Sequence, residues 1–140
     1  MEFWWLVAFG EGDRLDQLSE PTYTFVDRQQ AVYVPGKNNR CVMKWDRYAK
    51  EGIVVAGDQG EGSALAQLAN PKGVFVDSLD RLYVADTNND RVMRWSKGAT
   101  QGTVIMGGNG VGDNENQFDG PLGWSYDRHG NIYVVDYDNN

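Results

Sequence analysis

The sequence contains little of several residue types on which common protein chemistries depend. It has one cysteine and one histidine among 140 residues. A single cysteine excludes an internal disulfide framework, and one histidine with one cysteine provides no convincing zinc ligand set. Cys41 is expected to be a small, semi-buried structural residue rather than a nucleophile. Because no group of nucleophile, base and electrophilic stabiliser is apparent, we predict no catalysis, no metal and no cofactor.

Basic residues and long apolar runs are also scarce. Thirteen Lys and Arg residues stand against twenty Asp and Glu residues, giving a net charge of -7, and binding to phosphates needs a basic surface. The apolar run from Phe3 to Phe9 is far shorter than the roughly 20 residues of a transmembrane helix. It also lacks the basic start of a signal peptide. We therefore expect neither a nucleic-acid nor a membrane partner, and we interpret the run as a buried strand.

The chain is instead rich in internal repetition. The segments PTYTFVDRQQAVYV, PKGVFVDSLDRLYV and PLGWSYDRHGNIYV begin at Pro21, Pro71 and Pro121 and align with one another. Outside them, CVMKW at 41–45 aligns with RVMRW at 91–95. This period of 50 residues is typical of repeat architectures. It divides the chain into the last strand and link of a split repeat (1–20), two repeats (21–70 and 71–120) and the first half of another (121–140).

Each repeat is predicted to contain short strands separated by turns. In the middle repeat, β-rich segments at 73–76, 81–85, 91–95 and 103–106 alternate with turn-forming sequences. Only 63–70 could form a helical turn. Four strands in about 50 residues is the size of one blade of a β-propeller.

The middle repeat resembles the NHL-repeat β-propellers. The residues that carry the resemblance are Pro71, Gly73, Asp77, the run Tyr83-Val84-Ala85-Asp86, and Asn89 with Arg91-Val92. The resemblance implies four-stranded antiparallel blades, innermost strand first, arranged around a channel. It also implies a function, since such proteins act mainly as protein- or RNA-binding platforms, and a minority, similar to the amidating lyases, are metal-dependent enzymes.

A structural ion pair is predicted between Asp86 and Arg91. The aspartate ends one strand and the arginine begins the next, so that a charge-assisted hydrogen bond could tie the hairpin. In the first repeat Gly36 and Cys41 replace both residues together, which is what a structural pair predicts. The third repeat has Asp136, which is expected either to be exposed or to be paired by another chain.

The fold class that follows is all-β, an incomplete propeller closed by self-association, with six blades as a dimer. An exposed apolar blade face associates or aggregates, and a two-fold dimer would hide it. The expected assembly edge consists of Phe3, Trp4, Trp5, Tyr133 and Val135. The alternative is a fragment, natural or engineered, of a longer six-bladed protein.

Two functional classes remain open for such a chain. One is a scaffold whose partner is a second copy of itself, with another protein as a further candidate. The other is a binding platform formed by loops on one face, namely Lys37, Asn38, Arg40, Thr87, Asn88, Asp90, Tyr137 and Asp138. A fragment of an NHL-type metal-dependent lyase is the enzymatic alternative.

Overall fold

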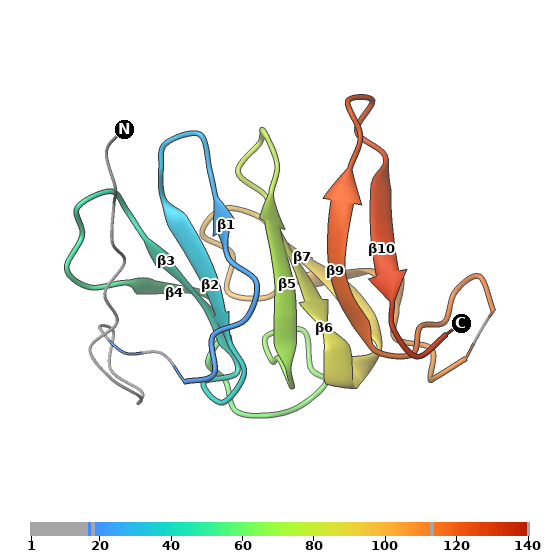
Figure 1. The fold of residues 1–140 in the computed structure, drawn as a ribbon. Coiled ribbons are helices and arrows are strands. Elements are labelled where there is room, and N and C mark those ends of the chain that lie inside the picture. Colours follow the sequence, from blue (N-terminus) through green and yellow to red (C-terminus); the bar gives the residue numbers. More distant parts are fainter. Residues whose placement is uncertain (1–16, 18, 113, 140) are drawn as a thin grey trace.

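The computed structural model describes residues 17, 19–112 and 114–139, and these form an arc of β-sheets standing side by side (Figure 1). The first sheet contains β1 (Phe25–Val26), β2 (Val32–Gly36), β3 (Cys41–Trp45) and β4 (Ile53–Gly57). The second contains β5 (Pro71–Val76), β6 (Leu82–Asp86), β7 (Arg91–Trp95) and β8 (Thr103–Gly107). The third contains β9 (Pro121–Tyr126) and β10 (Ile132–Asp136). The prediction of all-β, antiparallel blades is confirmed.

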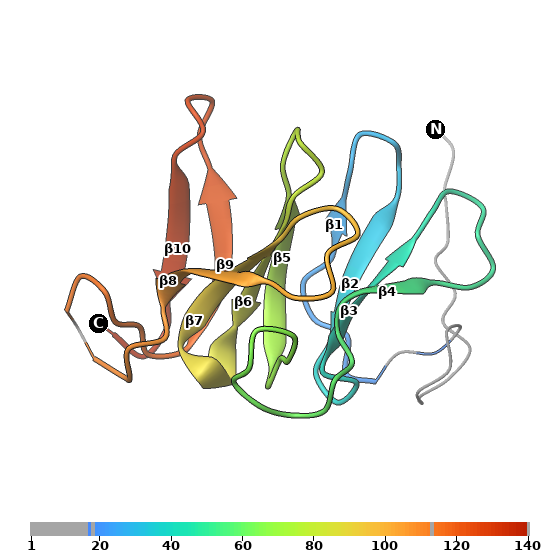
Figure 2. The ribbon, with the colours of Figure 1, turned by 180° about the vertical axis from the view of Figure 1, so that it is seen from behind.

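Within each sheet the strands follow chain order, so that each blade is a simple meander. The first strands β1, β5 and β9 lie next to one another along the inside of the arc. Figure 2 shows the opposite side, where β4 and β8 lie. The 50-residue period therefore corresponds to one blade, and the third blade is represented by its two inner strands.

A repeated aspartate shapes the first hairpin of every blade. The Asp77 carboxylate accepts hydrogen bonds from the backbone N–H groups of Leu79 and Arg81, at 2.9 and 3.0 Å, and from the Tyr83 hydroxyl at 3.1 Å. Local side-chain bonds of this kind favour turns over continued strand. Asp127 makes the same bonds to its own turn and to Tyr133, so these aspartates have a structural role.

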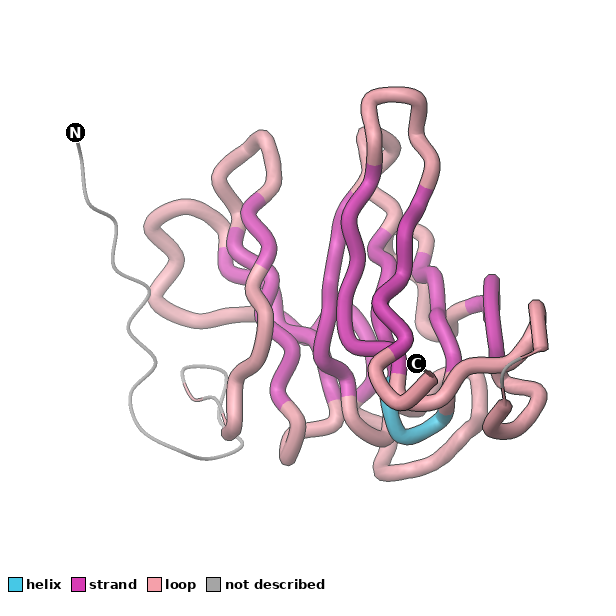
Figure 3. The backbone as a smooth tube through the Cα atoms, turned by 45° about the vertical axis from the view of Figure 1, so that its right-hand side comes forward, coloured by secondary structure: helices cyan, strands magenta, loops and turns pink. Residues whose placement is uncertain are grey.

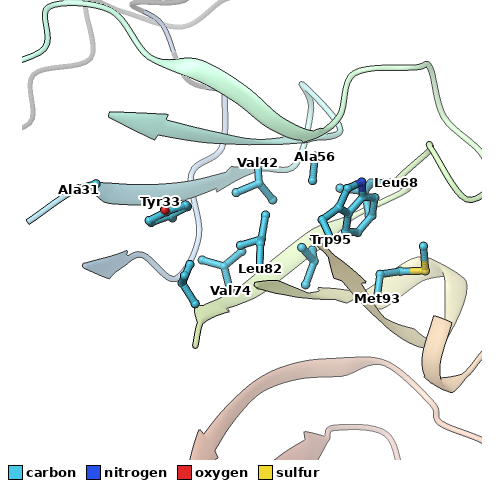
Figure 4. Packing of buried hydrophobic residues seen from close by; sticks show 11 residues of the cluster. Ala31, Tyr33, Val42, Ala56, Leu68, Val74, Leu82, Met93 and Trp95 are labelled. Carbon is cyan, nitrogen blue, oxygen red and sulfur yellow. The ribbon is translucent and has the colours of Figure 1, made fainter. Parts of the chain in front are cut away.

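The main core lies between the first and second blades (Figure 4). It joins Tyr33 and Val42 of the first blade to Val84, Met93 and Trp95 of the second. Alternate strand residues enter this core because successive side chains point to opposite faces of a sheet. A second buried cluster, formed by Val34, Cys41, Met43 and Trp45, lies on the other face of the first blade. Cys41, which was predicted to be semi-buried, is buried, at 3% exposure.

The second and third blades approach each other closely at a glycine. A Cβ atom at Gly73 in β5 would lie 2.6 Å from the carbonyl oxygen of Leu122 and 2.7 Å from the Cα of Gly123 in β9. Any larger side chain at Gly73 would therefore force the second and third blades apart.

The structure differs from the sequence predictions at element boundaries. Segment 63–70 contains turns and bends and no helix, whereas Thr87–Asn89, predicted as loop, forms one turn of 3-10 helix, which is the single helical element among the described residues (Figure 3). Phe3, Trp4 and Trp5 lie outside the described residues. No helix in the described part of the chain has the length and apolar character needed to span a bilayer.

Candidate interaction surfaces

The predicted pair of Asp86 and Arg91 is in contact and almost fully buried. The Arg91 Nε donates to Asp86 Oδ2 at 2.9 Å, and their side chains are 4% and 0% exposed. The remaining guanidinium N–H groups donate to the backbone carbonyls of Ser63, Ala64 and Gln67 at 2.6 to 3.2 Å. The pair therefore closes the β6–β7 hairpin and also fastens to it the link, residues 58–70, that leads from β4 into β5.

Other groups complete the network around the Asp86 carboxylate. The backbone N–H of Ala69 donates to Oδ1 at 2.9 Å, and the Asn89 side chain donates to Oδ2 at 2.7 Å. Asn89 also reaches the carbonyl of Gly62 at 2.8 Å. A buried carboxylate is stable only when its oxygens are paired in this way.

In the first blade, a neutral side chain holds the preceding link to the hairpin. The side-chain oxygen of Asn39 accepts the backbone N–H of Ser19 at 2.8 Å, and the link is again held to the hairpin. A Cβ atom at Gly36 would lie 2.9 Å from that oxygen. Gly36 thus makes room for an asparagine that replaces the carboxylate, and the joint loss of both charged residues has a structural cause.

The third blade repeats the network of the second around Asp136. The backbone N–H of Asp119 donates to Asp136 Oδ1 at 2.8 Å. Asn139 donates both to Asp136 Oδ2 and to the carbonyl of Gly112. Asp136 is half-buried rather than exposed, and its carboxylate accepts hydrogen bonds from its own chain. The alternative of a partner from another chain stays a prediction.

A groove lies between the second and third blades, on the side of the arc where the loops after the second strands are found. It has a volume of about 470 Å³. Five of the eight predicted loop-face residues line it, namely Thr87, Asn88, Asp90, Tyr137 and Asp138. Lys37, Asn38 and Arg40 belong to the first blade and do not line it. Sequence comparison of the loops could not have separated these two groups, because the separation depends on which blades are neighbours.

Negative charge gathers at this groove. Burial raises the pKa of Asp119 above its usual value, and the charges of Asp138, Asp90 and Asp136 raise it further. The groove is therefore suited to a cationic partner. Among the described residues, no three His, Cys, Asp or Glu side chains are arranged to hold a metal ion.

A larger hollow of about 740 Å³ is lined by the hairpin turns after the first strands and by several aromatic residues. Phe75 lies between Phe25 and Tyr126, at ring-centroid distances of 5.5 and 4.6 Å. Charged residues of the hairpin turns also line the hollow. Asp27, Asp77 and Asp127 among them accept hydrogen bonds from their own turns, and Asp80 pairs with Lys97. Sequence reasoning missed these three aromatic residues because each is also a good strand former.

The outer face of β9–β10 is an exposed apolar surface. Tyr33, Tyr83 and Tyr133 occupy one repeat position, yet they are 7%, 6% and 57% exposed. Val135 is also 57% exposed, whereas Ala85 at the same position of the second blade is fully buried. The predicted edge residues Tyr133 and Val135 thus lie together on a blade face that the described residues leave uncovered.

Gly123 lies on the same face and corresponds to Gly73 in the second repeat. A Cβ atom at Gly73 would strike the next blade, but a Cβ atom at Gly123 would meet nothing within 4 Å. Gly123 therefore leaves the room that an adjacent blade would need, but no described residue fills it.

Together, the meandering four-stranded sheets and their radial stacking define a β-propeller. A sequence model of the NHL repeat matches residues 68–94, which contain the Asp86–Arg91 pair. The match covers the second blade, which is accordingly of the NHL-repeat type.

Among solved structures, the chain is similar to an auxiliary nutrient binding protein from Bacteroides thetaiotaomicron VPI-5482, with a TM-score of 0.67 and 18% sequence identity. The similarity covers 83% of this chain but 35% of that protein. No curated protein matches the sequence. At this identity the likeness shows the fold.

Proposed function

We propose that this NHL-type propeller arc is a non-catalytic scaffold that associates with a second copy of itself, using the outer face of β9–β10. The observation that carries the proposal is the exposure of Tyr133, 57% against 6% for Tyr83 at the same position. Each blade of a propeller needs a neighbour, because one repeat cannot bury its apolar face alone.

The expected assembly is a two-fold ring in which the β9–β10 face of each copy packs on the first blade of the other. Repeat symmetry supplies the complementary surface. The second blade presents Val84, Met93 and Trp95 to its neighbour, and the first blade has Val34, Met43 and Trp45 at the same positions. Since that cluster is buried in the single chain, ring formation requires the first blade to expose it.

Solution mass, measured by ultracentrifugation or light scattering, tests the proposal. A dimer is expected for the unchanged chain, and Gly123→Ala is expected to weaken association at least tenfold because its methyl group would meet the partner's backbone. Isolated Gly123→Ala chains should melt as the unchanged chain does, since the methyl group meets nothing within 4 Å.

A charge on the face provides a second variant with a matched control. Val135→Lys should abolish association, whereas Val111→Lys, in a link at 59% exposure, should leave it unchanged. A stable monomer at high concentration would overturn the proposal, as would equal effects of the two lysine variants.

A protein-binding platform is the second candidate. The groove lined by Asp90, Asp138 and Tyr137 supports it, because acidic side chains and an exposed tyrosine suit a basic protein surface. Asp90→Asn with Asp138→Asn should then reduce capture of a basic partner without changing the solution mass of the chain.

A further inference from the structure

The hollow lined by the first hairpin turns is a surface that the proposed self-association does not use. Its walls come from β1, β5 and β9 and from the turns that follow these strands. Each of the three strands is paired with the next strand of its own blade. Because a repeat contacts only its neighbours, further blades would extend this inner wall and leave the three hairpins in place.

The size of the hollow suits a small molecule. Its volume is about 740 Å³, and small-molecule sites in proteins have volumes of roughly 300–1,000 Å³. Such sites combine aromatic or apolar walls with a few polar groups that orient the ligand. The hollow has both kinds of lining, and the two are taken in turn below.

The apolar part of the lining is a stack of three aromatic rings. Phe75 packs edge-on against Phe25 and at an angle of 35° to Tyr126. Ser125, and not Tyr126, occupies the repeat position of Phe25 and Phe75, so the third ring joins the stack from a different position. Tyr126 remains 56% exposed, and a flat ring that enters the hollow can stack on it.

The acidic side chains of the lining are already occupied. Asp27, Asp77 and Asp127 accept hydrogen bonds from the backbone of their own turns. Asp80 pairs with Lys97 at the rim, at 2.9 Å. These carboxylates are therefore not available to pair with a ligand without breaking contacts that shape the hairpins.

Two arginines of the lining are available instead. Arg81 is bound to Asp77 at 2.6 Å. Arg28 and Arg128, which share one repeat position, are exposed, and neither has an ion-pair or hydrogen-bond partner among the described residues. The groups that the hollow offers to a ligand are thus aromatic rings and guanidinium groups.

We propose that this hollow binds a small aromatic carboxylate. The ring of the ligand stacks on Tyr126, and its carboxylate pairs with the guanidinium groups of Arg28 and Arg128, because guanidinium and carboxylate match in geometry as well as in charge. The inference goes beyond the proposed scaffold function, since it names a ligand and does not require a second copy of this chain.

Cinnamate is the probe, and cinnamamide is its uncharged counterpart of nearly the same shape. Binding of each to the full chain is measured by calorimetry. Cinnamate should bind at one site per chain, and its affinity should fall as salt is added, because salt screens exposed charges. Cinnamamide should bind at least threefold more weakly.

Two charge variants separate the arginines of the hollow from the charge of the chain as a whole. Arg28→Gln with Arg128→Gln should weaken cinnamate binding about three- to tenfold, as the loss of charged hydrogen bonds at an exposed site predicts. Arg47→Gln with Lys50→Gln removes the same charge from the loop between β3 and β4, outside the hollow. This control should change the affinity less than twofold.

A third variant tests the ring. Tyr126→Leu keeps an apolar side chain but removes the stacking surface, and it should weaken binding about two- to tenfold. Melting curves of all variants show whether each is folded at the temperature of the titration. Val135→Lys, on the outer face of β9–β10, should leave the affinity for cinnamate unchanged.

The inference is overturned if cinnamate does not bind or binds no better than cinnamamide. It is also overturned if the two charge variants have equal effects, or if Val135→Lys abolishes binding, since the probe would then lie on the apolar face. The proposed function is judged separately by solution mass. A monomer that binds cinnamate through the arginines removes self-association alone, and a dimer that ignores cinnamate removes the ligand site alone.

Discussion

Replacement of Arg91 by methionine should destabilise the chain more than any surface substitution. Methionine keeps much of the side-chain volume but leaves the Asp86 carboxylate, which is 0% exposed, without its cation. Removal of one partner of a buried ion pair costs about 3–5 kcal/mol. Because a domain is stable by only about 5–15 kcal/mol, this loss is a large fraction of the total.

The melting temperature should fall by roughly 6–20 °C, at about 2–4 °C per kcal/mol for a chain near 150 residues. The measurement is thermal and urea unfolding, followed by circular dichroism at one protein concentration so that association does not alter the comparison.

The double variant Asp86→Asn with Arg91→Met is the control. Asparagine keeps an oxygen that can accept the N–H of Ala69, as Asn39 does for Ser19 in the first blade. Since no buried charge remains, the double variant should be more stable than Arg91→Met alone. If Arg91→Met costs less than about 1 kcal/mol, or if the two single losses simply add, the buried-pair argument is wrong.

Three further outcomes are expected. Thr87→Val should cost about 1–3 kcal/mol in urea unfolding, because the buried Thr87 hydroxyl donates to Pro121 O at 2.7 Å and this hydrogen bond would be lost. Gly107→Ala should cost about 1 kcal/mol or more, since φ is +70° and the added Cβ would lie 2.2 Å from the Asp90 carbonyl. Burial opposes ionisation of Asp77, but bonds from Arg81, Leu79 and Tyr83 outweigh it and lower the pKa of Asp77. Its stabilisation is therefore present above pH about 4 and is lost as the pH falls through the lower, folded value. Asp77→Asn should then lose the most stability near neutral pH and little in acid, and a constant loss across pH 2–7 would contradict this.

Much of the fold could be predicted from the sequence because residues of several different types recur at the same spacing of 50. Strand and turn signals supported the same four-strand unit, and the spacing of Asp86 and Arg91 predicted contact across one tight hairpin. The exceptions were local. Segment 63–70 has helix-forming residues, but its carbonyls bind the Arg91 guanidinium, and this tertiary contact holds it as turns.

The candidate surfaces were less predictable. Loop residues were identified by their position after the second strands, yet only those between the second and third blades line one groove. Asn39 as the neutral replacement for a carboxylate was missed, because its role depends on the room left by Gly36.

The sequence by itself determined the repeat, the strands and the hairpin pairs, because these depend on contacts between residues close along the chain. Only the tertiary structure decided which copy of each repeated residue is buried. Tyr83 and Tyr133 share a motif and a hydrogen bond to the preceding aspartate, but one lies under the next blade and the other faces solvent. Burial depends on what stands opposite a residue in space, and a pattern that is the same in every repeat carries no record of that.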